Sequence, residues 1–173
     1  MSISPWRRFR LFPLAFAMGV FVFPAAAPAE EPGDVLALNS RGLSKNISTT
    51  PNRTVFEFEL HDLATGERIG TVHDDVFCST STPPPCAVFD AFTTFNLPGG
   101  DITNHAQVSV TPDPQRPGFF LVAAHPDADS IVAATGIYAG RTGQIRLHGH
   151  DDGRGYPNTL GADDLWSVVL NPR

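Results

Sequence analysis

The sequence predicts an all-β fold, a closed antiparallel barrel of eight strands in one domain. The first observation is a series of short segments rich in Val, Ile, Phe and Thr, which Gly, Pro, Asp or Asn interrupt roughly every ten residues. The second is that no longer stretch has the period of a helix, in a chain with 16 prolines. The third is the closely spaced glycines Gly136, Gly140 and Gly143, which are typical of a sheet that bends until it closes.

The first 29 residues predict a secretory signal peptide. Three arginines precede an apolar run over residues 11–23, and Ala27-Pro28-Ala29 fits the small-x-small rule for cleavage. The alternative is a retained membrane anchor, but the run is shorter than the roughly 20 residues of a spanning helix. We therefore expect cleavage before Glu30, a mature domain over residues 30–173, and a secreted or periplasmic location.

The charge of the chain argues against two classes of partner. The predicted signal peptide holds three of the 12 basic residues and none of the 18 acidic ones, and the chain has a single lysine, Lys45. Phosphate backbones are bound by clusters of Lys and Arg, so we expect no nucleic-acid partner. An acidic surface is also repelled by acidic lipid headgroups, so no membrane partner is expected after cleavage.

The two cysteines, Cys78 and Cys86, flank a Pro-rich loop. Outside the cytoplasm a nearby pair is normally oxidised, so we predict a disulfide that clips this loop. Closing so short a loop is worth about 2 to 3 kcal/mol in the chain-entropy model. The alternative is a redox or metal pair, which would normally have two residues between the cysteines, whereas here seven residues separate them.

The first half of the chain predicts five strands. The run 54–61 alternates with period two, which places Phe56 and Phe58 on one face and glutamates on the other, as in a half-buried strand. The run 102–110 alternates most clearly, and its apolar face includes Asn104, a buried amide that needs a partner or a ligand. The five strands are expected at residues 35–40, 54–61, 68–77, 87–97 and 102–110.

The run 87–97 is rich in aromatic residues but does not alternate. Phe89, Phe92 and Phe95 recur every three residues, which does not suit one flat face of a strand. A bulge, or burial of both faces, would reconcile this spacing. The inward side chains of these strands predict a ligand-binding interior formed by Phe56, Phe58, Phe89, Phe95 and Asn104.

The second half predicts a strand at 119–125, a glycine-bent hairpin at 131–148 and a last strand at 165–170. Between the last two lies an acidic, glycine-rich stretch, which we interpret as a loop over residues 151–164. No linker is long enough to divide the domain, which favours a barrel over a propeller or two domains. About eight strands enclose just enough space for side chains or one small ligand.

Three stretches of the sequence resemble the allene oxide cyclases and dirigent proteins. They are D-L-A-T-G-E-R-I-G at 62–70, C-A-V-F-D-A-F-T-T-F-N-L-P-G-G-D-I at 86–102 and A-T-G-I-Y-A-G-R-T-G-Q-I-R-L at 134–147. The resemblance implies an eight-stranded antiparallel barrel with a largely apolar cavity, which is cofactor-free and often trimeric. Dirigent proteins use acidic, Arg and Tyr side chains in the cavity, which implies Asp90, Tyr138 and Arg141 as catalytic residues here.

A run of metal-binding residue types, His148, His150, Asp151 and Asp152, ends the predicted hairpin. Imidazole and carboxylate groups at alternating positions can converge on an ion such as Zn²⁺. The other interpretation is a polar strand end that runs into a solvated loop. We adopt this second interpretation and predict no metal site.

The leading hypothesis is an exported barrel that binds an apolar small molecule and steers a cofactor-free isomerisation or cyclisation. Holding a flexible molecule in one reactive shape inside a dry cavity lowers the barrier by several kcal/mol without a nucleophile. Two alternatives remain open. One is a non-catalytic carrier or sensor of a hydrophobic ligand, and the other is a structural or assembly module whose outer faces form a homotrimer.

Overall fold

The computed structural model describes residues 33–48, 50, 53–78, 87–126 and 128–173. The predicted signal peptide and Cys86 lie outside the described residues, so the cleavage before Glu30 and the disulfide to Cys78 stay predictions. Within the described ranges, no helix has the length and hydropathy needed to cross a membrane.

The described residues form one sheet of antiparallel strands. The predicted strands are present, and several extend beyond their expected ends. A single 3₁₀ turn, η1 (Gly136–Tyr138), follows the short strand β7. The strands are β1 (Asp34–Lys45), β2 (Arg53–Asp62), β3 (Arg68–Cys78), β4 (Val88–Leu97), β5 (Gly100–Pro112), β6 (Phe119–Ala124), β7 (Ile131–Ala134), β8 (Gly143–Asp152) and β9 (Thr159–Leu170).

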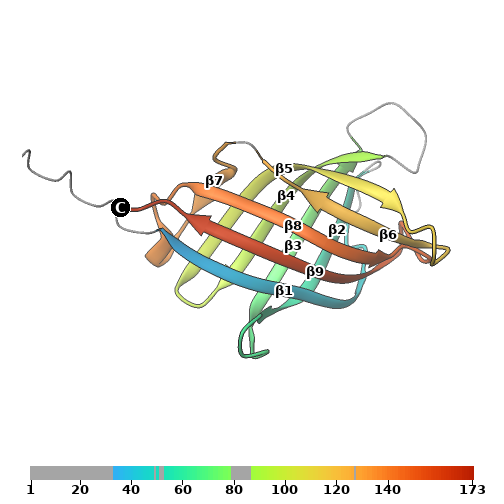
Figure 1. Cartoon of the computed structure of the whole chain (residues 1–173), viewed down its shortest axis with the longest axis horizontal. Coiled ribbons are helices and arrows are strands. Elements are labelled where there is room, and N and C mark those ends of the chain that lie inside the picture. Colours follow the sequence, from blue (N-terminus) through green and yellow to red (C-terminus); the bar gives the residue numbers. More distant parts are fainter. Residues whose placement is uncertain (1–32, 49, 51–52, 79–86, 127) are drawn as a thin grey trace, which may run out of the picture.

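Eight of these strands close into a barrel (Figure 1). The sheet runs in the order β4-β3-β2-β1-β9-β8-β6-β5, and pairing of β4 with β5 completes the circle. Most neighbours follow one another in the sequence, but β9 returns to pair with β1 along its whole length. The prediction of a closed antiparallel barrel of eight strands is confirmed, with β7 as an additional strand.

Alternation along the strands separates a packed interior from the outer surface. On β2 the side chains of Phe56, Phe58 and Leu60 are buried while Glu57 and Glu59, which alternate with them, are exposed, as predicted. Deep in the barrel, Phe95 packs edge-on against Trp166 with ring centroids 5.1 Å apart. The other large buried apolar side chains of this core are Leu38, Val72, Leu97, Ile102, Ile145, Leu147, Val168 and Leu170.

The stretch 131–148 is not the predicted hairpin. β7 pairs with the first part of β5, whereas β8 pairs with β6 and β9. β7 therefore lies on the same edge of β5 as β6, but further toward the start of β5. Gly136 has a φ of +57°, and a Cβ there would lie 1.8 Å from the carbonyl oxygen of Gly99. The glycine permits a close crossing of two chain segments rather than a bend within paired strands.

The aromatic strand β4 needs neither a bulge nor burial of both faces. Its pairing with β3 and β5 is continuous, so its side chains alternate strictly. Phe89 and Phe95 belong to the inward set, whereas Phe92 points outward and is 40% exposed. Phe92 stacks on His105 of β5, with ring centroids 4.3 Å apart. Both explanations offered for the three-residue spacing are therefore wrong.

The acidic stretch 151–164 is predicted to be a loop, but both of its ends belong to strands. β8 continues to Asp152 and β9 begins at Thr159, so only a short turn separates the two strands. The two strands pair along their whole length, including this region. Asp151 and Asp164 therefore belong to strands in the wall of the barrel, where both line the pocket described below.

Candidate functional site

A pocket of about 100 Å³ lies inside the barrel, toward the end where β6 and β9 begin. Its wall is mostly apolar and aromatic, and it includes Phe56, Phe89, Phe120 and Trp166. A water molecule needs roughly 10 to 15 Å³ of such space, so the pocket has room for several waters or a small organic molecule.

Three aspartates from three strands line this pocket: Asp74 on β3, Asp151 on β8 and Asp164 on β9. Alternation directs them inward, because Asp164 lies between the buried residues Ala162 and Trp166 in the period-two series of β9. β3 is not a neighbour of β8 or β9 in the sheet. The three carboxyls meet because the sheet closes on itself.

The carboxyl groups are only partly satisfied by hydrogen bonds. The Thr93 hydroxyl donates to Asp74 Oδ1 at 2.7 Å. Trp166 Nε1 donates to the Ser40 hydroxyl at 2.8 Å, and that hydroxyl donates to Asp164 Oδ2 at 3.4 Å. The Oδ1 atoms of Asp151 and Asp164 are buried and accept no hydrogen bond from the described residues. Because both residues line the pocket, their carboxyls keep unused acceptor capacity beside it.

Burial raises the pKa of all three carboxyls. The pKa of Asp74 rises from 3.8 to about 6, because desolvation outweighs the hydrogen bond from Thr93. Burial, and then the nearby charge of Asp74, raises the pKa of Asp151 to about 7. Burial, and then the charges of Asp151 and Asp74, raises the pKa of Asp164 well above its ordinary value. Asp74 and Asp151 therefore release their protons closer to neutral pH than an ordinary carboxyl does, and each charge that develops affects the neighbouring carboxyls.

The position of the Asp164 carboxyl depends on a glycine in the neighbouring strand. Gly149 on β8 lies directly opposite Asp164 in the sheet. A Cβ at Gly149 would lie 1.7 Å from Asp164 Oδ1 and 2.9 Å from Asp164 Cα. Any residue other than glycine at position 149 would therefore displace the Asp164 carboxyl.

Aromatic rings surround the outer part of the pocket. The Tyr156 ring lies 6.3 Å from the Phe56 ring and 6.4 Å from the Phe89 ring, centroid to centroid. Its hydroxyl is 3.5 Å from the Thr54 hydroxyl, and Tyr156 is 37% exposed. Tyr156 thus marks the mouth of the pocket, where an amphipathic side chain can contact both solvent and ligand.

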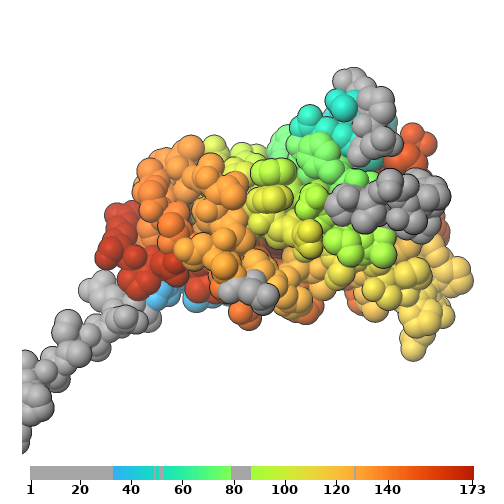
Figure 2. Space-filling model, turned by 90° about the horizontal axis from the view of Figure 1, so that it is seen from above, coloured from blue at the N-terminus to red at the C-terminus, as the bar shows by residue number. Residues whose placement is uncertain are grey.

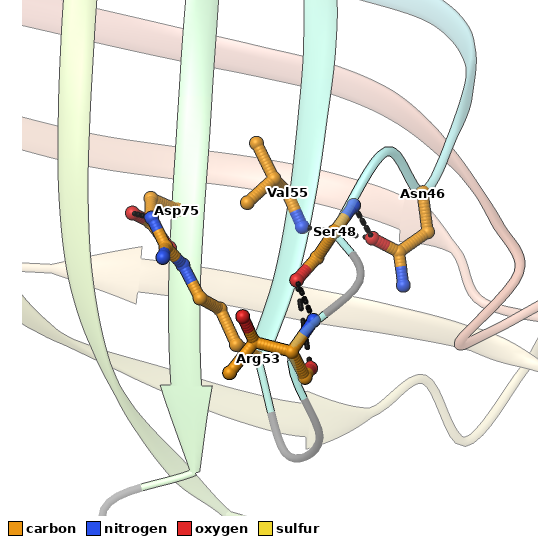
Figure 3. Close-up of polar contacts among 6 residues, drawn as sticks. Asn46, Ser48, Arg53, Val55 and Asp75 are labelled. Carbon is orange, nitrogen blue, oxygen red and sulfur yellow. Dashed lines mark hydrogen bonds and ion pairs between the residues drawn. The ribbon is translucent and has the colours of Figure 1, made fainter.

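The start of β2, next to this mouth, is held by polar contacts (Figure 3). Asn46 Oδ1 accepts hydrogen bonds from the backbone N–H groups of Ser48 and Val55, at 2.9 and 3.0 Å. Arg53 donates to Asp75 of β3, with Nε 2.7 Å from Oδ1. The amide and the ion pair fix the entry of the chain into β2 and thereby the rim of the pocket.

The predicted ligand-binding residues divide between pocket and core. Phe56 and Phe89 line the pocket. Phe58 and Phe95 are buried in the core and are not part of the pocket wall. Asn104 is 2% exposed, and its Oδ1 accepts no hydrogen bond from the described residues, but it also lies outside the pocket wall.

The residues implied as catalytic by the family resemblance do not meet in the pocket. Asp90 belongs to the outward set of β4. Tyr138 lies in η1, and Arg141 is bound to Asp34 and to the Asn171 carbonyl, at 3.0 Å each. Figure 2 shows the orange segment of β7 and η1 at one end of the molecule, with the yellow β5–β6 turn toward the other.

The side chains that could have formed a metal site, those of His148, His150, Asp151 and Asp152, do not share one face of β8. His148 and His150 are exposed on the outer face of β8, whereas Asp151 lines the pocket. His150 instead lies 2.6 Å from an Arg116 nitrogen, and His148 packs against His125. Among the described residues, no group of three or more His, Cys, Asp or Glu is arranged to hold a metal ion.

The three pocket aspartates are absent from the residues predicted as functional. Alternation alone could have found two of them. Asp164 continues the inward series of Trp166 and Val168, and Asp74 shares a face with Val72. Asp151 carried no such signal, because the polar and glycine-rich residues around it suggested a loop.

Fold and site together define a class, a closed antiparallel barrel with an acidic pocket of ligand size. No family model matches the sequence, and no curated protein matches it. Among solved structures, the chain is similar to one described as pyocyanin demethylase, with 19% sequence identity and a TM-score of 0.45. That match covers 80% of this chain and 100% of the other.

Proposed function

We propose that the chain binds a small, largely apolar molecule inside the barrel and moves a proton between two positions of that molecule, a cofactor-free isomerisation. One observation carries the proposal: three carboxyls line an otherwise mostly apolar pocket, and two of them have an oxygen atom that accepts no hydrogen bond from the described part of the chain. A carboxyl whose pKa is near 7 can both accept and donate a proton at neutral pH, which suits general acid-base catalysis.

Asp151 is assigned the proton transfer. Its carboxylate removes a proton from a carbon atom of the bound molecule, and the electron pair of that C–H bond moves into an adjacent double bond system. The carboxyl then returns the proton to a different atom of the same molecule, so the carboxylate is regenerated and no oxidant is needed. Asp74 and Asp164 hold the polar group of the molecule, and the Asp74 charge helps to keep the pKa of Asp151 high.

A non-catalytic carrier of the same kind of ligand is the second candidate. The aromatic wall formed by Phe56, Phe89 and Phe120 would bind an apolar molecule whether or not the carboxyls act on it. The two candidates differ in what Asp151 does once the ligand is bound. An experiment on the bound ligand therefore separates them.

The ligand should exchange carbon-bound hydrogen with solvent in the presence of the protein. Native mass spectrometry of protein isolated from its own host identifies the bound molecule, which is then incubated with the protein in D₂O. We expect deuterium to enter the ligand at carbon, and the rate to fall by about 10² to 10⁴ in Asp151→Asn. The mass spectrum of the ligand measures the exchange.

Asp163→Asn is the matched control, because Asp163 is the exposed neighbour of Asp164 on the outer face of β9. We expect this variant to keep the wild-type exchange rate. A wild-type protein that binds the molecule without any exchange at carbon would reject the isomerisation and leave the carrier. Equal rates in Asp151→Asn and wild type would reject the role of Asp151.

We also propose that the protein is exported, that Cys78 and Cys86 form a disulfide, and that the chain assembles as a homotrimer. Support comes from the predicted signal peptide, from the two cysteines beside a Pro-rich loop, and from the family resemblance. The intact mass of the same isolated protein should correspond to a chain that begins at Glu30. Reduction should add two hydrogen atoms, and the native mass should equal three chains. A chain that keeps its first 29 residues would contradict the export.

A further inference from the structure

The ionisable side chains in the wall of the pocket are acidic. Asp74, Asp151 and Asp164 are its ionisable acids, while the described residues of its wall include no Lys, Arg or His. Two arginines next to wall residues in the sequence bind carboxylates elsewhere: Arg53, beside Thr54, donates to Asp75 at 2.7 Å, and Arg154, beside Gly153, donates to Asp152 at 2.8 Å. Within the part of the chain that the structure describes, no basic side chain of the wall balances the charge that these acids develop on ionisation.

Asp164 lines the pocket with a carboxyl whose acceptor capacity is only partly used. The residue is 3% exposed, and its Oδ1 accepts no hydrogen bond from the described residues, although its Oδ2 has the Ser40 hydroxyl as a partner. A buried carboxylate oxygen without a donor or a counter-charge is costly. A ligand that supplies both would remove this cost.

The wall offers a second feature that favours positive charge. The aromatic side chains that line the pocket include Phe56, Phe89, Tyr156 and Trp166. The Tyr156 ring contacts two of them, with its centroid 6.3 Å from that of Phe56 and 6.4 Å from that of Phe89. The faces of aromatic rings attract cations, most strongly where water is excluded. Aromatic side chains and carboxylates in the wall thus point to the same class of ligand from independent observations.

We propose that the pocket takes a small organic cation, such as an alkylated ammonium group, with Asp164 as its counter-ion and the aromatic side chains of the wall in contact with the cation. The proposal rests on the proposed function, because it specifies the charge of the molecule on which Asp151 acts. A preference for cations would exclude neutral and anionic molecules, which an apolar barrel without these carboxyls would accept equally well.

Three probes of the same shape test the charge preference. Choline, 3,3-dimethylbutan-1-ol and 3,3-dimethylbutanoate present a cation, a neutral group and an anion on nearly identical skeletons. In isothermal titration calorimetry at neutral pH, we expect choline to bind at least about tenfold more tightly than the alcohol, and the anion to bind most weakly. Asp164→Asn should bring choline and the alcohol to similar affinities, whereas Asp163→Asn should keep the preference.

The outcomes separate this inference from the proposed function. Equal binding of choline and the alcohol, tighter binding of the anion, or no binding of choline would overturn the cation site. A neutral or anionic ligand in the protein isolated from its host would overturn it as well, while hydrogen exchange at carbon would still support the isomerisation. If Asp164→Asn does not fold, Asp151→Asn and Asp74→Asn provide the same comparison of choline with the alcohol.

Discussion

Raising the pH from about 4 to about 8 should destabilise the ligand-free protein by on the order of 5 kcal/mol. Each unit by which folding raises the pKa of a carboxyl corresponds to about 1.4 kcal/mol. The pKa of Asp74 rises from 3.8 to about 6 and that of Asp151 to about 7, mainly because both are buried. Part of the shift in Asp151 comes from Asp74, so the two contributions overlap and are not simply added.

The sign of the effect follows from proton uptake. Below pH 3.8 these carboxyls are protonated in the folded and the unfolded chain alike. Between about 4 and 7 the unfolded chain has released protons that the folded chain still holds, so a rise in pH favours unfolding. Asp62, Asp113 and Asp152 have lowered pKa values, mainly because of hydrogen bonds. Their stabilisation is lost only as the pH falls below about 4, outside this window.

Urea unfolding at pH 4.5, 6 and 7.5 measures the effect. Asp151→Asn should be more stable than wild type at pH 7.5 and show a flatter dependence on pH, because it cannot release the proton. Asp90→Asn is the control, since Asp90 is on the outer face of β4 and should leave the slope unchanged. A free energy of unfolding that stays level or increases from pH 4.5 to 7.5 would contradict the raised pKa values.

Replacing Phe95 by alanine should cost about 3 to 5 kcal/mol of stability, the usual range for emptying a buried aromatic site. Phe95 is fully buried, packs edge-on against Trp166, and belongs to the core rather than to the pocket wall. The substitution would therefore leave a cavity beneath the pocket, without removing a group that touches the ligand.

Phe92→Ala is the matched control, because Phe92 lies on the same strand but points outward. It is 40% exposed and its stacking on His105 is worth about 1 kcal/mol, so its loss should be small by comparison. Urea unfolding measures both variants, and Phe95→Leu supplies a milder change if Phe95→Ala does not fold. Similar losses for Phe92 and Phe95 would contradict the assignment of inward and outward faces.

The alternation of apolar and polar residues along a strand predicts which side chains enter the barrel. The predicted alternation at Phe56 and Phe58 is present, and Asp74 and Asp164 also obey the same rule. The rule works because successive side chains of a strand point to opposite faces whatever the strand pairs with. Where glycines and acidic residues obscured the pattern, over residues 151–164, the end of β8 and the start of β9 were missed.

The amino-acid sequence by itself determined the all-β class, the approximate strands and the inward face of each clear run. Only the tertiary structure decided which strands are neighbours, and hence that β7 pairs with β5 rather than β8, and that Asp74, Asp151 and Asp164 share one pocket. The physical reason is that the two kinds of information act over different distances along the chain. Alternation is a local property of the backbone, whereas the meeting of three carboxyls depends on closing a sheet whose first and last strands pair across the whole chain.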